Sequence, residues 1–227
     1  MGERDRALKL IEKVEQYKDS TNDSYLLGGI YVKKAAVFAG AKNFETSEKY
    51  YSIAIDNYSD KDSSYIADAI YFRGNQRFYR GRFLDALQDY QLASEYYENL
   101  GDKQYQFYTM ASIINVYGVN GFNLKTIEER KKLIQKKIDE NYPSNLYSDY
   151  YNQSLNYKKV DSIKQQESSL LKAYEIISKK EQNSIDRIIQ MRIKSSISSF
   201  YSAQNNLSKS KKFLDEAEKD FKKIDKI

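Results

Sequence analysis

The chain has 227 residues, of which 41% are hydrophobic and 30% charged, and its formal net charge is +5 at pH 7. It contains no cysteine and no histidine, which excludes disulfides, thiol nucleophiles, imidazole bases and the usual zinc sites. No phosphate loop, dinucleotide fingerprint or nucleophile elbow is present, so an enzyme is the least favoured class and no cofactor or metal is expected.

The remaining composition predicts an all-α fold. Nine glycines and one proline, Pro143, favour long helices, and no alternating apolar runs between turn clusters indicate strands. The charge is mild, and lysines alternate with acids on helix faces, which predicts solvated surfaces and no direct nucleic-acid binding; examples are Lys131, Lys132, Lys136 and Lys137. No apolar run approaches the roughly 18 residues of a membrane span, so no membrane insertion by this segment is expected.

The first predicted helix runs from Arg6 to Tyr17, with Leu8, Ile11 and Val14 directed inward. It matches the second helix of a helix pair, without the first helix before it. We therefore expect the sequence to be a fragment of a longer protein, or one whose leading helix has been removed.

A sequence motif that repeats along the chain defines the remaining predicted units. The segment 42–54 is echoed by 81–93 and by 206–217, and such a period indicates stacked helix pairs. One position near the middle of each second helix recurs at spacings of 40, 39, 40, 40 and 44 residues: Val14, Ala54, Ala93, Leu133, Ala173 and Ala217. We expect one right-handed α-solenoid over 1–227 with about eleven helices, in a half repeat at 3–20 and repeats at roughly 22–60, 61–101, 102–142, 143–181 and 182–227.

Each unit is expected to contain helix A, a short turn and helix B. In the clearest unit, helix A runs from about Ser63 to Tyr79 and helix B from about Phe83 to Leu100, and Gly101 then ends helix B while Asp102 caps the next helix. Apolar residues open the B helices at Phe44, Phe83, Ile163 and Leu207. Glycines mark the turn between the two helices at Gly40, Gly81 and Gly121, and Pro143 separates the third unit from the fourth.

Small residues in the B helices predict close helix packing, because helices about 8–10 Å apart need a small side chain where they cross. Gly74 has the same interpretation, whereas Gly28 and Gly29 mark either the start of a helix or a kink. The acids at Asp56, Asp60 and Asp62 are interpreted as caps. The last helix carries apolar residues on one side and a polar outer face, so it is expected to cap the stack; these residues are Phe213, Leu214, Ala217, Phe221 and Ile224.

The repeat residues carry a family resemblance. Gly74, Gly81, Ala86, Tyr90 and Ala93 stand as in a tetratricopeptide repeat (TPR), although the period here is about 40 rather than 34 and the usual proline after helix B is absent. The long repeats and the segment 150–159 are also similar to the sensory TPR stretch of bacterial membrane-associated transcriptional regulators or histidine kinases. The regulatory TPR domains of quorum-sensing peptide receptors form the nearest rival.

The resemblance implies a ligand groove on the concave face, which helix A residues line. The candidate lining residues are Asp68, Tyr71, Asn75, Phe78, Tyr108, Ala111, Asn115, Gly118, Tyr151, Leu155 and Lys158. Asn75 and Asn115 lie 40 residues apart at equivalent positions, and a side-chain amide offers a donor and an acceptor that suit an extended peptide backbone. We expect Asn75→Ala to weaken ligand binding with little change in thermal stability.

The chain contains 22 tyrosines. Most are expected to pack between helices with the hydroxyl reaching water or a partner, and Tyr71, Tyr108 and Tyr151 are the candidates for an aromatic groove. The favoured function is a non-catalytic protein- or peptide-binding module, as the sensory or scaffold part of a bacterial signalling or transcription regulator. The alternatives are an intracellular receptor for a signalling peptide, with a deep groove, and an assembly subunit that forms a homodimer through its last helices. The compartment stays open between the cytoplasm and the periplasm.

Overall fold

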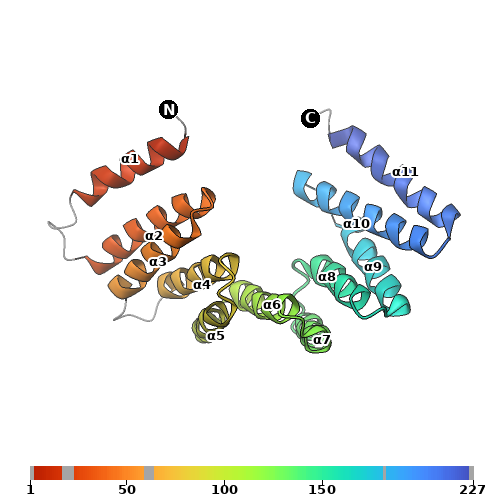
Figure 1. Ribbon diagram of the computed structural model, residues 1–227, viewed down its shortest axis with the longest axis horizontal. Coiled ribbons are helices and arrows are strands. Elements are labelled where there is room, and N and C mark those ends of the chain that lie inside the picture. The colour runs from red at the N-terminus through yellow and green to blue at the C-terminus, as the bar shows by residue number, and fades with distance from the viewer. Residues whose placement is uncertain (1–2, 17–22, 59–63, 181–182, 225–227) are drawn as a thin grey trace. The chain divides into compact units, whose positions relative to one another are not determined.

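The computed structural model describes residues 3–16, 23–58, 64–180 and 183–224. Within these ranges the chain forms eleven helices and no strand (Figure 1). Asp60 and Asp62, and the predicted helix ends at Tyr17 and Ser63, lie outside the described residues. The helices are α1 (Glu3–Glu15), α2 (Ser24–Gly40), α3 (Phe44–Tyr58), α4 (Ser64–Tyr79), α5 (Phe83–Asn99), α6 (Lys103–Val119), α7 (Asn123–Asp139), α8 (Leu146–Lys158), α9 (Ile163–Ser178), α10 (Ser184–Ala203) and α11 (Leu207–Ile224).

The helices belong to two compact units. Unit 1 is Met1–Val119 and contains α1 to α6, and unit 2 is Asn120–Ile227 and contains α7 to α11. Within each unit, consecutive helices pack against one another as hairpins, α2 with α3, α4 with α5, α8 with α9 and α10 with α11. The all-helical prediction is confirmed.

A residue with positive φ joins helix A to helix B in every pair, and we call it the turn residue. The turn residues are Lys42, Gly81, Gly121, Asp161 and Asn205. Each B helix begins two residues later, so the predicted starts at Phe44, Phe83, Ile163 and Leu207 are confirmed. The placement of Gly40 in this turn was wrong, because Gly40 is the last residue of α2 and Lys42 takes the left-handed conformation instead.

The small residue predicted at the middle of helix B lies twelve positions after each turn residue. Ala54, Ala93, Leu133 and Ala173 are fully buried, and Ala217 nearly so. Val14 does not follow this pattern, because its side chain is 43% exposed in α1 and no described helix covers that face. Helix α1 is instead joined to α2 by the ion pair from Lys34 Nζ to Glu15 Oε2 at 2.7 Å.

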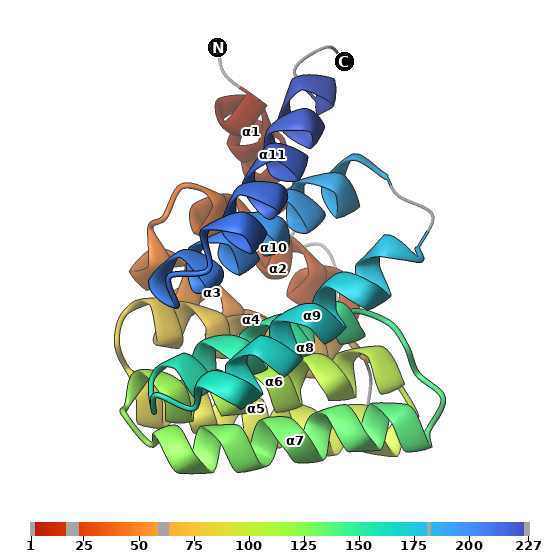
Figure 2. The ribbon, with the colours of Figure 1, turned by 90° about the vertical axis from the view of Figure 1, so that its right-hand side faces the viewer.

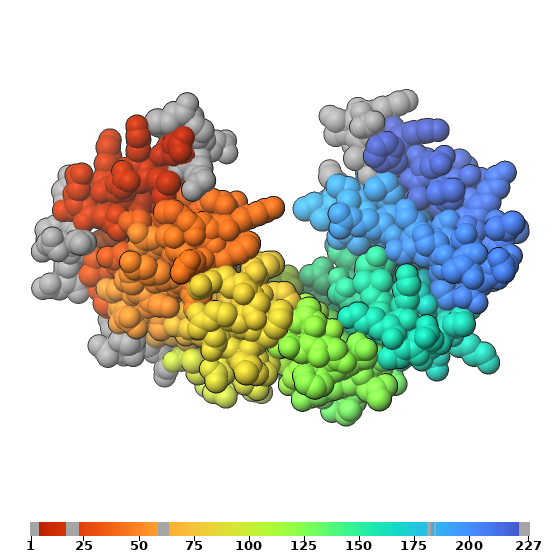
Figure 3. All heavy atoms as spheres, in the orientation of Figure 1, coloured from red at the N-terminus to blue at the C-terminus, as the bar shows by residue number. Residues whose placement is uncertain are grey.

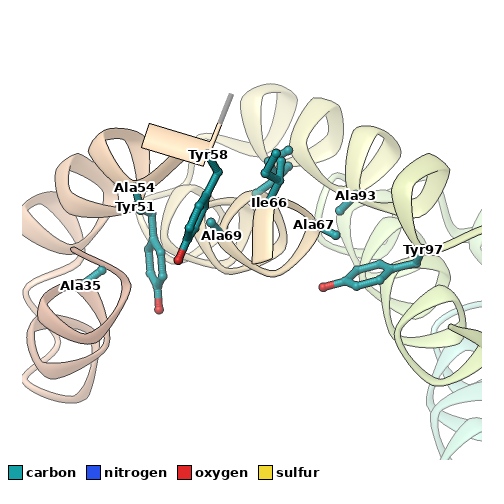
Figure 4. Packing of buried hydrophobic residues seen from close by; sticks show 10 residues of the cluster. Ala35, Tyr51, Ala54, Tyr58, Ile66, Ala67, Ala69, Ala93 and Tyr97 are labelled. Carbon is teal, nitrogen blue, oxygen red and sulfur yellow. The ribbon is translucent and has the colours of Figure 1, made fainter. Parts of the chain in front are cut away.

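The main core of unit 1 fills the space between α2, α3, α4 and α5. Figure 4 shows its alanines on the helices and the rings of Tyr51, Tyr58 and Tyr97 extending between them. A Cβ on Gly28 would lie 2.3 Å from the ring of Tyr58, and one on Gly74 would lie 2.9 Å from the ring of Tyr90. Gly28 therefore does not mark a helix start; it lies within α2, which begins at Ser24, and leaves room for a tyrosine ring.

The core of unit 2 lies between α8, α9, α10 and α11, seen from the side in Figure 2. Buried charges join helix α7 to α8. Lys137 is 4% exposed and donates to Asp149 Oδ2 at 2.6 Å, and the guanidinium of Arg130 lies 3.7 Å from Asp149. The prediction of a solvated face was wrong for Lys137, because its register turns it toward α8.

Candidate functional site

The candidate residues on α4 and α6 meet at a pocket of about 250 Å³ in unit 1. We call it the unit-1 pocket. It lies between α4, α5 and α6, and its lining residues are Tyr71, Asn75, Phe78, Tyr79, Tyr90, Ser112 and Asn115. Four of the predicted groove residues therefore surround one pocket: Tyr71, Asn75, Phe78 and Asn115.

Asn75 has a defined orientation in this pocket. The hydroxyl of Tyr90 on α5 donates to Asn75 Oδ1 at 2.8 Å. Burial raises the pKa of Tyr90, as do the nearby Tyr71, Tyr79 and Asp89, so its phenol stays protonated and remains a donor. Because the carbonyl side of the Asn75 amide accepts this hydrogen bond, the amide NH₂ is the group left for the pocket.

This hydrogen bond corrects one expectation. Tyr90 is only 2% exposed, so replacing Asn75 with alanine removes the acceptor from a buried hydroxyl. An unpaired buried polar group costs about 1–3 kcal/mol. Asn75→Ala is therefore expected to lower stability as well as any binding, and it cannot separate the two.

The wall of the unit-1 pocket is aromatic. The ring of Tyr71 lies 5.8 Å from that of Tyr90, and the ring of Phe78 lies 5.5 Å from that of Phe83. The hydroxyl of Tyr71 is 3.5 Å from Ser112 Oγ on α6. The pocket thus combines flat apolar walls with amide and hydroxyl groups from two successive A helices.

A buried ionic network holds α4 between its neighbours. Arg73 makes two hydrogen bonds to Asp89 on α5, at 3.0 and 2.7 Å, and Arg77 bridges Asp89 and Glu48. Glu48 on α3 also binds Arg80 and Arg82. Burial alone would raise the pKa of Glu48, but the hydrogen bonds from Arg77 and Arg80 and the charge of Arg82 outweigh it and lower that pKa. The network fixes the position of the helix that carries Tyr71 and Asn75.

Four predicted residues of unit 1 lie outside the pocket lining: Asp68, Tyr108, Ala111 and Gly118. Asp68 accepts a hydrogen bond from Tyr97 at 2.6 Å, and burial raises the pKa of its carboxyl. The ring of Tyr108 packs edge-on against that of Tyr105, with 5.7 Å between the ring centres. Asp68 and Tyr108 therefore have packing partners within unit 1. Each lies about one helical turn before the pocket residues of its own A helix.

The candidate residues on α8 lie in unit 2. Leu155 and Lys158 line a pocket of about 460 Å³ between α8, α9 and α10, which we call the unit-2 pocket. Its walls also carry Gln166 from α9 and Ser196 and Ser199 from α10. Tyr151 lies beside it, with its hydroxyl 3.0 Å from Ser196 Oγ.

The two pockets occupy equivalent places in the repeat. Tyr71 and Tyr151 both lie ten residues before their turn residue, and each contacts a serine that lies nine residues before the next turn residue. These serines, Ser112 and Ser196, and the buried Tyr90 are not among the site residues predicted from the sequence. Alignment of the units on the turn residue is the signal that would have found them.

Among the described residues, no cluster of three or more His, Cys, Asp or Glu side chains is arranged to hold a metal ion. None of the described helices has the length and apolar character that crossing a membrane requires.

No protein-family model matches the chain, and no curated protein matches it by sequence. Solved structures do match in fold. BtubC (BKLC) from P. vanneervenii has a TM-score of 0.77 at 11% identity, over 98% of this chain and 89% of that one. A putative kinesin light chain of Podosopora anserina with nearly identical TPR-like repeats has a TM-score of 0.70 at 7% identity, over 91% of this chain and 100% of that one.

A Rap protein complexed with competence and sporulation factor is also similar, with a TM-score of 0.70 at 11% identity, over 96% of this chain and 59% of that one. At these identities the likeness concerns the fold alone. Together with the helix pairs and their recurring turn residue, it shows that this chain has the TPR-like helical repeat fold.

Proposed function

We propose that this chain is a non-catalytic module that binds an extended peptide segment of a partner through the unit-1 pocket. The observation that carries the proposal is the position of Asn75 and Asn115 on successive A helices beside one aromatic-walled pocket. We further propose that it acts as the sensory or scaffold part of a bacterial signalling or transcription regulator.

The chemistry of the pocket suits a peptide backbone. Tyr90 holds the carbonyl of Asn75, which leaves the amide NH₂ to donate to a peptide carbonyl. Neighbouring packed helices lie about 8–10 Å apart, and an extended chain advances about 3.3 Å per residue. Amides on α4 and α6 would therefore contact backbone groups about three residues apart, with a side chain between them against Tyr71 and Phe78.

The test separates the amide donor from the structural acceptor. Asn75→Asp keeps an oxygen that accepts from Tyr90 and removes the NH₂ group, so the fold is retained while the donor is lost. Short random peptides displayed on phage are selected against the wild-type chain, and the enriched peptides are measured by calorimetry. We expect Asn75→Asp to weaken their binding about tenfold or more, since losing a buried hydrogen bond costs about 1–3 kcal/mol.

Asn99→Asp is the matched control. Asn99 is an exposed residue at the end of α5 and does not line the pocket, so the same change of charge there should leave binding unaltered. Equal affinities of the wild type and both variants would overturn the proposal, and so would a selection that enriches no peptide.

A second candidate is a receptor domain for a signalling peptide. The observation that favours it is the similar fold of the Rap protein complexed with competence and sporulation factor. It differs from the first candidate in predicting that a short free peptide is bound whole, with both its ends. Acetylation of the amino end and amidation of the carboxyl end of the selected peptides distinguish the two: a receptor loses affinity for the blocked form, whereas a module that binds an internal segment does not.

A further inference from the structure

The B helices α3 and α5 use the same positions to pack on the next helix A. The ring of Tyr51 stacks on that of Phe72, nine residues after one turn residue and nine before the next. Tyr58 stacks on Tyr65, and Tyr97 stacks on Tyr105. In both pairs the first tyrosine lies sixteen residues after one turn residue and the second lies sixteen residues before the next. The residues nine and sixteen after the turn therefore form the seam that one unit presents to the next.

These two positions are buried on the four earlier B helices that follow a turn residue, α3, α5, α7 and α9. In every case the residues at these positions are at most 4% exposed: Tyr51 and Tyr58, Tyr90 and Tyr97, Arg130 and Lys137, and Leu170 and Ile177. The corresponding residues of α11 are Leu214 and Phe221, which are 46% and 54% exposed. Leu207, one step earlier in the series, is 71% exposed. The expected polar outer face of the last helix is therefore contradicted.

The opposite side of α11 packs within unit 2. Phe213 and Ala217 are buried against α9 and α10, and Glu216 and Asp220 pair with Lys194. Helix α11 lies in front of α10 in Figure 2, and its atoms reach the surface of unit 2 in Figure 3. The apolar stripe of Leu207, Leu214 and Phe221, which we call the α11 stripe, thus faces away from the core of its own unit.

The α11 stripe is complementary to itself. Leu207 and Phe221 lie seven residues on either side of Leu214, and residues seven apart fall on nearly the same side of a helix. Lys211 lies three residues before Leu214 and Glu218 four after it, and at 3.6 residues per turn both fall on the same flank, about 40–60° from Leu214. Both side chains are exposed, and within the described residues neither forms an ion pair.

We propose that the α11 stripe is a homodimer interface, in which two copies of α11 pack antiparallel about a two-fold axis through Leu214. In this arrangement Leu207 of one copy contacts Phe221 of the other, and Lys211 faces Glu218 of the partner copy twice, because a two-fold axis brings the same flank of both helices together. The proposal is independent of the pockets on the A helices.

The size of the contact sets the expected affinity. Helix α11 has 18 residues and is about 27 Å long at 1.5 Å per residue. A single helix pair of this length buries less than the roughly 1,600 Å² of a standard stable interface. We therefore expect a micromolar, concentration-dependent dimer, which light scattering over a range of protein concentrations detects as a rise from the monomer to the dimer mass.

Cysteine cross-linking tests the geometry, because the natural chain has no cysteine. Leu214→Cys should form a disulfide-linked dimer under mild oxidation, since the two copies meet there. Leu207→Cys alone should not, because its symmetry mate lies about 21 Å away and a disulfide needs Cα atoms within about 7 Å. A mixture of Leu207→Cys and Phe221→Cys should cross-link as a heterodimer. Leu84→Cys, at an exposed site on α5, is the control and should form no disulfide-linked dimer.

Charge exchange tests the partner contacts. Lys211→Glu should weaken the dimer about tenfold, because two ion pairs become repulsive, and adding Glu218→Lys to it should restore the affinity. Far-UV circular dichroism checks that each variant is folded. A monomer at every concentration would overturn the proposal, and so would Leu207→Cys cross-linking to itself as readily as Leu214→Cys. Failure here leaves the peptide-binding proposal untouched, because peptide selection does not involve α11.

Discussion

The adjacent glycines of α2 offer a direct test of the packing in unit 1. Gly28 and Gly29 have the same residue type, the same helix and nearly the same place in it. A Cβ on Gly28 would lie 2.3, 2.5 and 2.7 Å from three ring carbons of Tyr58, whereas a Cβ on Gly29 would meet only the Tyr58 hydroxyl at 3.7 Å. The first distance is a clash and the second is an ordinary contact.

The magnitude follows from two effects. Replacing glycine with alanine inside a helix gains about 1 kcal/mol, and this gain is the same for both positions. Overpacking a well-filled core costs about 1–3 kcal/mol, and it applies to Gly28 alone. Tyr58 cannot move aside easily, because it is 3% exposed and its ring lies 5.7 and 5.9 Å from those of Tyr25 and Tyr65.

We therefore expect Gly29→Ala to stabilise the chain by about 1 kcal/mol and Gly28→Ala to be less stable than Gly29→Ala by about 1–3 kcal/mol. The assay is urea unfolding followed by far-UV circular dichroism. Tyr58→Leu is the rescue background: with the ring removed, Gly28→Ala should become as favourable as Gly29→Ala. Stabilities of the two alanine variants that agree within about 0.5 kcal/mol in the natural background would refute a clash at Gly28, since that is the scatter of substitutions with no structural effect.

The ion pairs of Glu48 and the hydrogen bond between Tyr97 and Asp68 give three further predictions. Glu48→Gln should cost about 1–3 kcal/mol at neutral pH, as a partly buried ion pair is broken, while the exposed Glu45→Gln should change stability by less than about 0.5 kcal/mol. Because the folded-state pKa of Glu48 is lowered from 4.5, its contribution is present above that value and is lost as the pH falls through the lowered pKa. Urea unfolding at several pH values should therefore show that the free energies of unfolding of the natural chain and of Glu48→Gln converge in acid. A difference between them that does not change with pH would contradict this. Tyr97→Phe should cost about 1–3 kcal/mol by leaving Asp68 without its donor, and an unchanged unfolding midpoint would count against that hydrogen bond. The folded-state pKa of Asp68 is raised, unlike that of Glu48, so its contribution to stability is lost as the pH rises through that pKa. Asp68→Asn should therefore stabilise the chain at neutral pH and not in acid.

The repeat could be predicted from the sequence because it depends on local chemistry. Helix ends follow from residues that leave the helical conformation, such as Gly81, Gly101 and Gly121, and all three have positive φ. The alanines at Ala54 and Ala93 were identified by spacing alone, and both are completely buried. Lys42 escaped prediction because nothing local distinguishes a lysine in the left-handed conformation from one in a helix.

Only part of the candidate site could be predicted from the sequence in the same way. The A-helix register that brought Tyr71, Asn75, Phe78 and Asn115 to one pocket follows from counting back from the turn. The sequence could not show that Asn75 is held by Tyr90, because that contact joins residues 15 positions apart on two helices.

The sequence by itself therefore determined where the helices begin and end, which faces are apolar and how the units repeat, since these depend on residues within one or two turns of each other. Only the tertiary structure decided which side chains of those faces are covered. Leu214 and Leu170 occupy the same position in the repeat, yet one is 46% exposed and the other 2%. Burial depends on the neighbouring helix, which the local sequence does not encode.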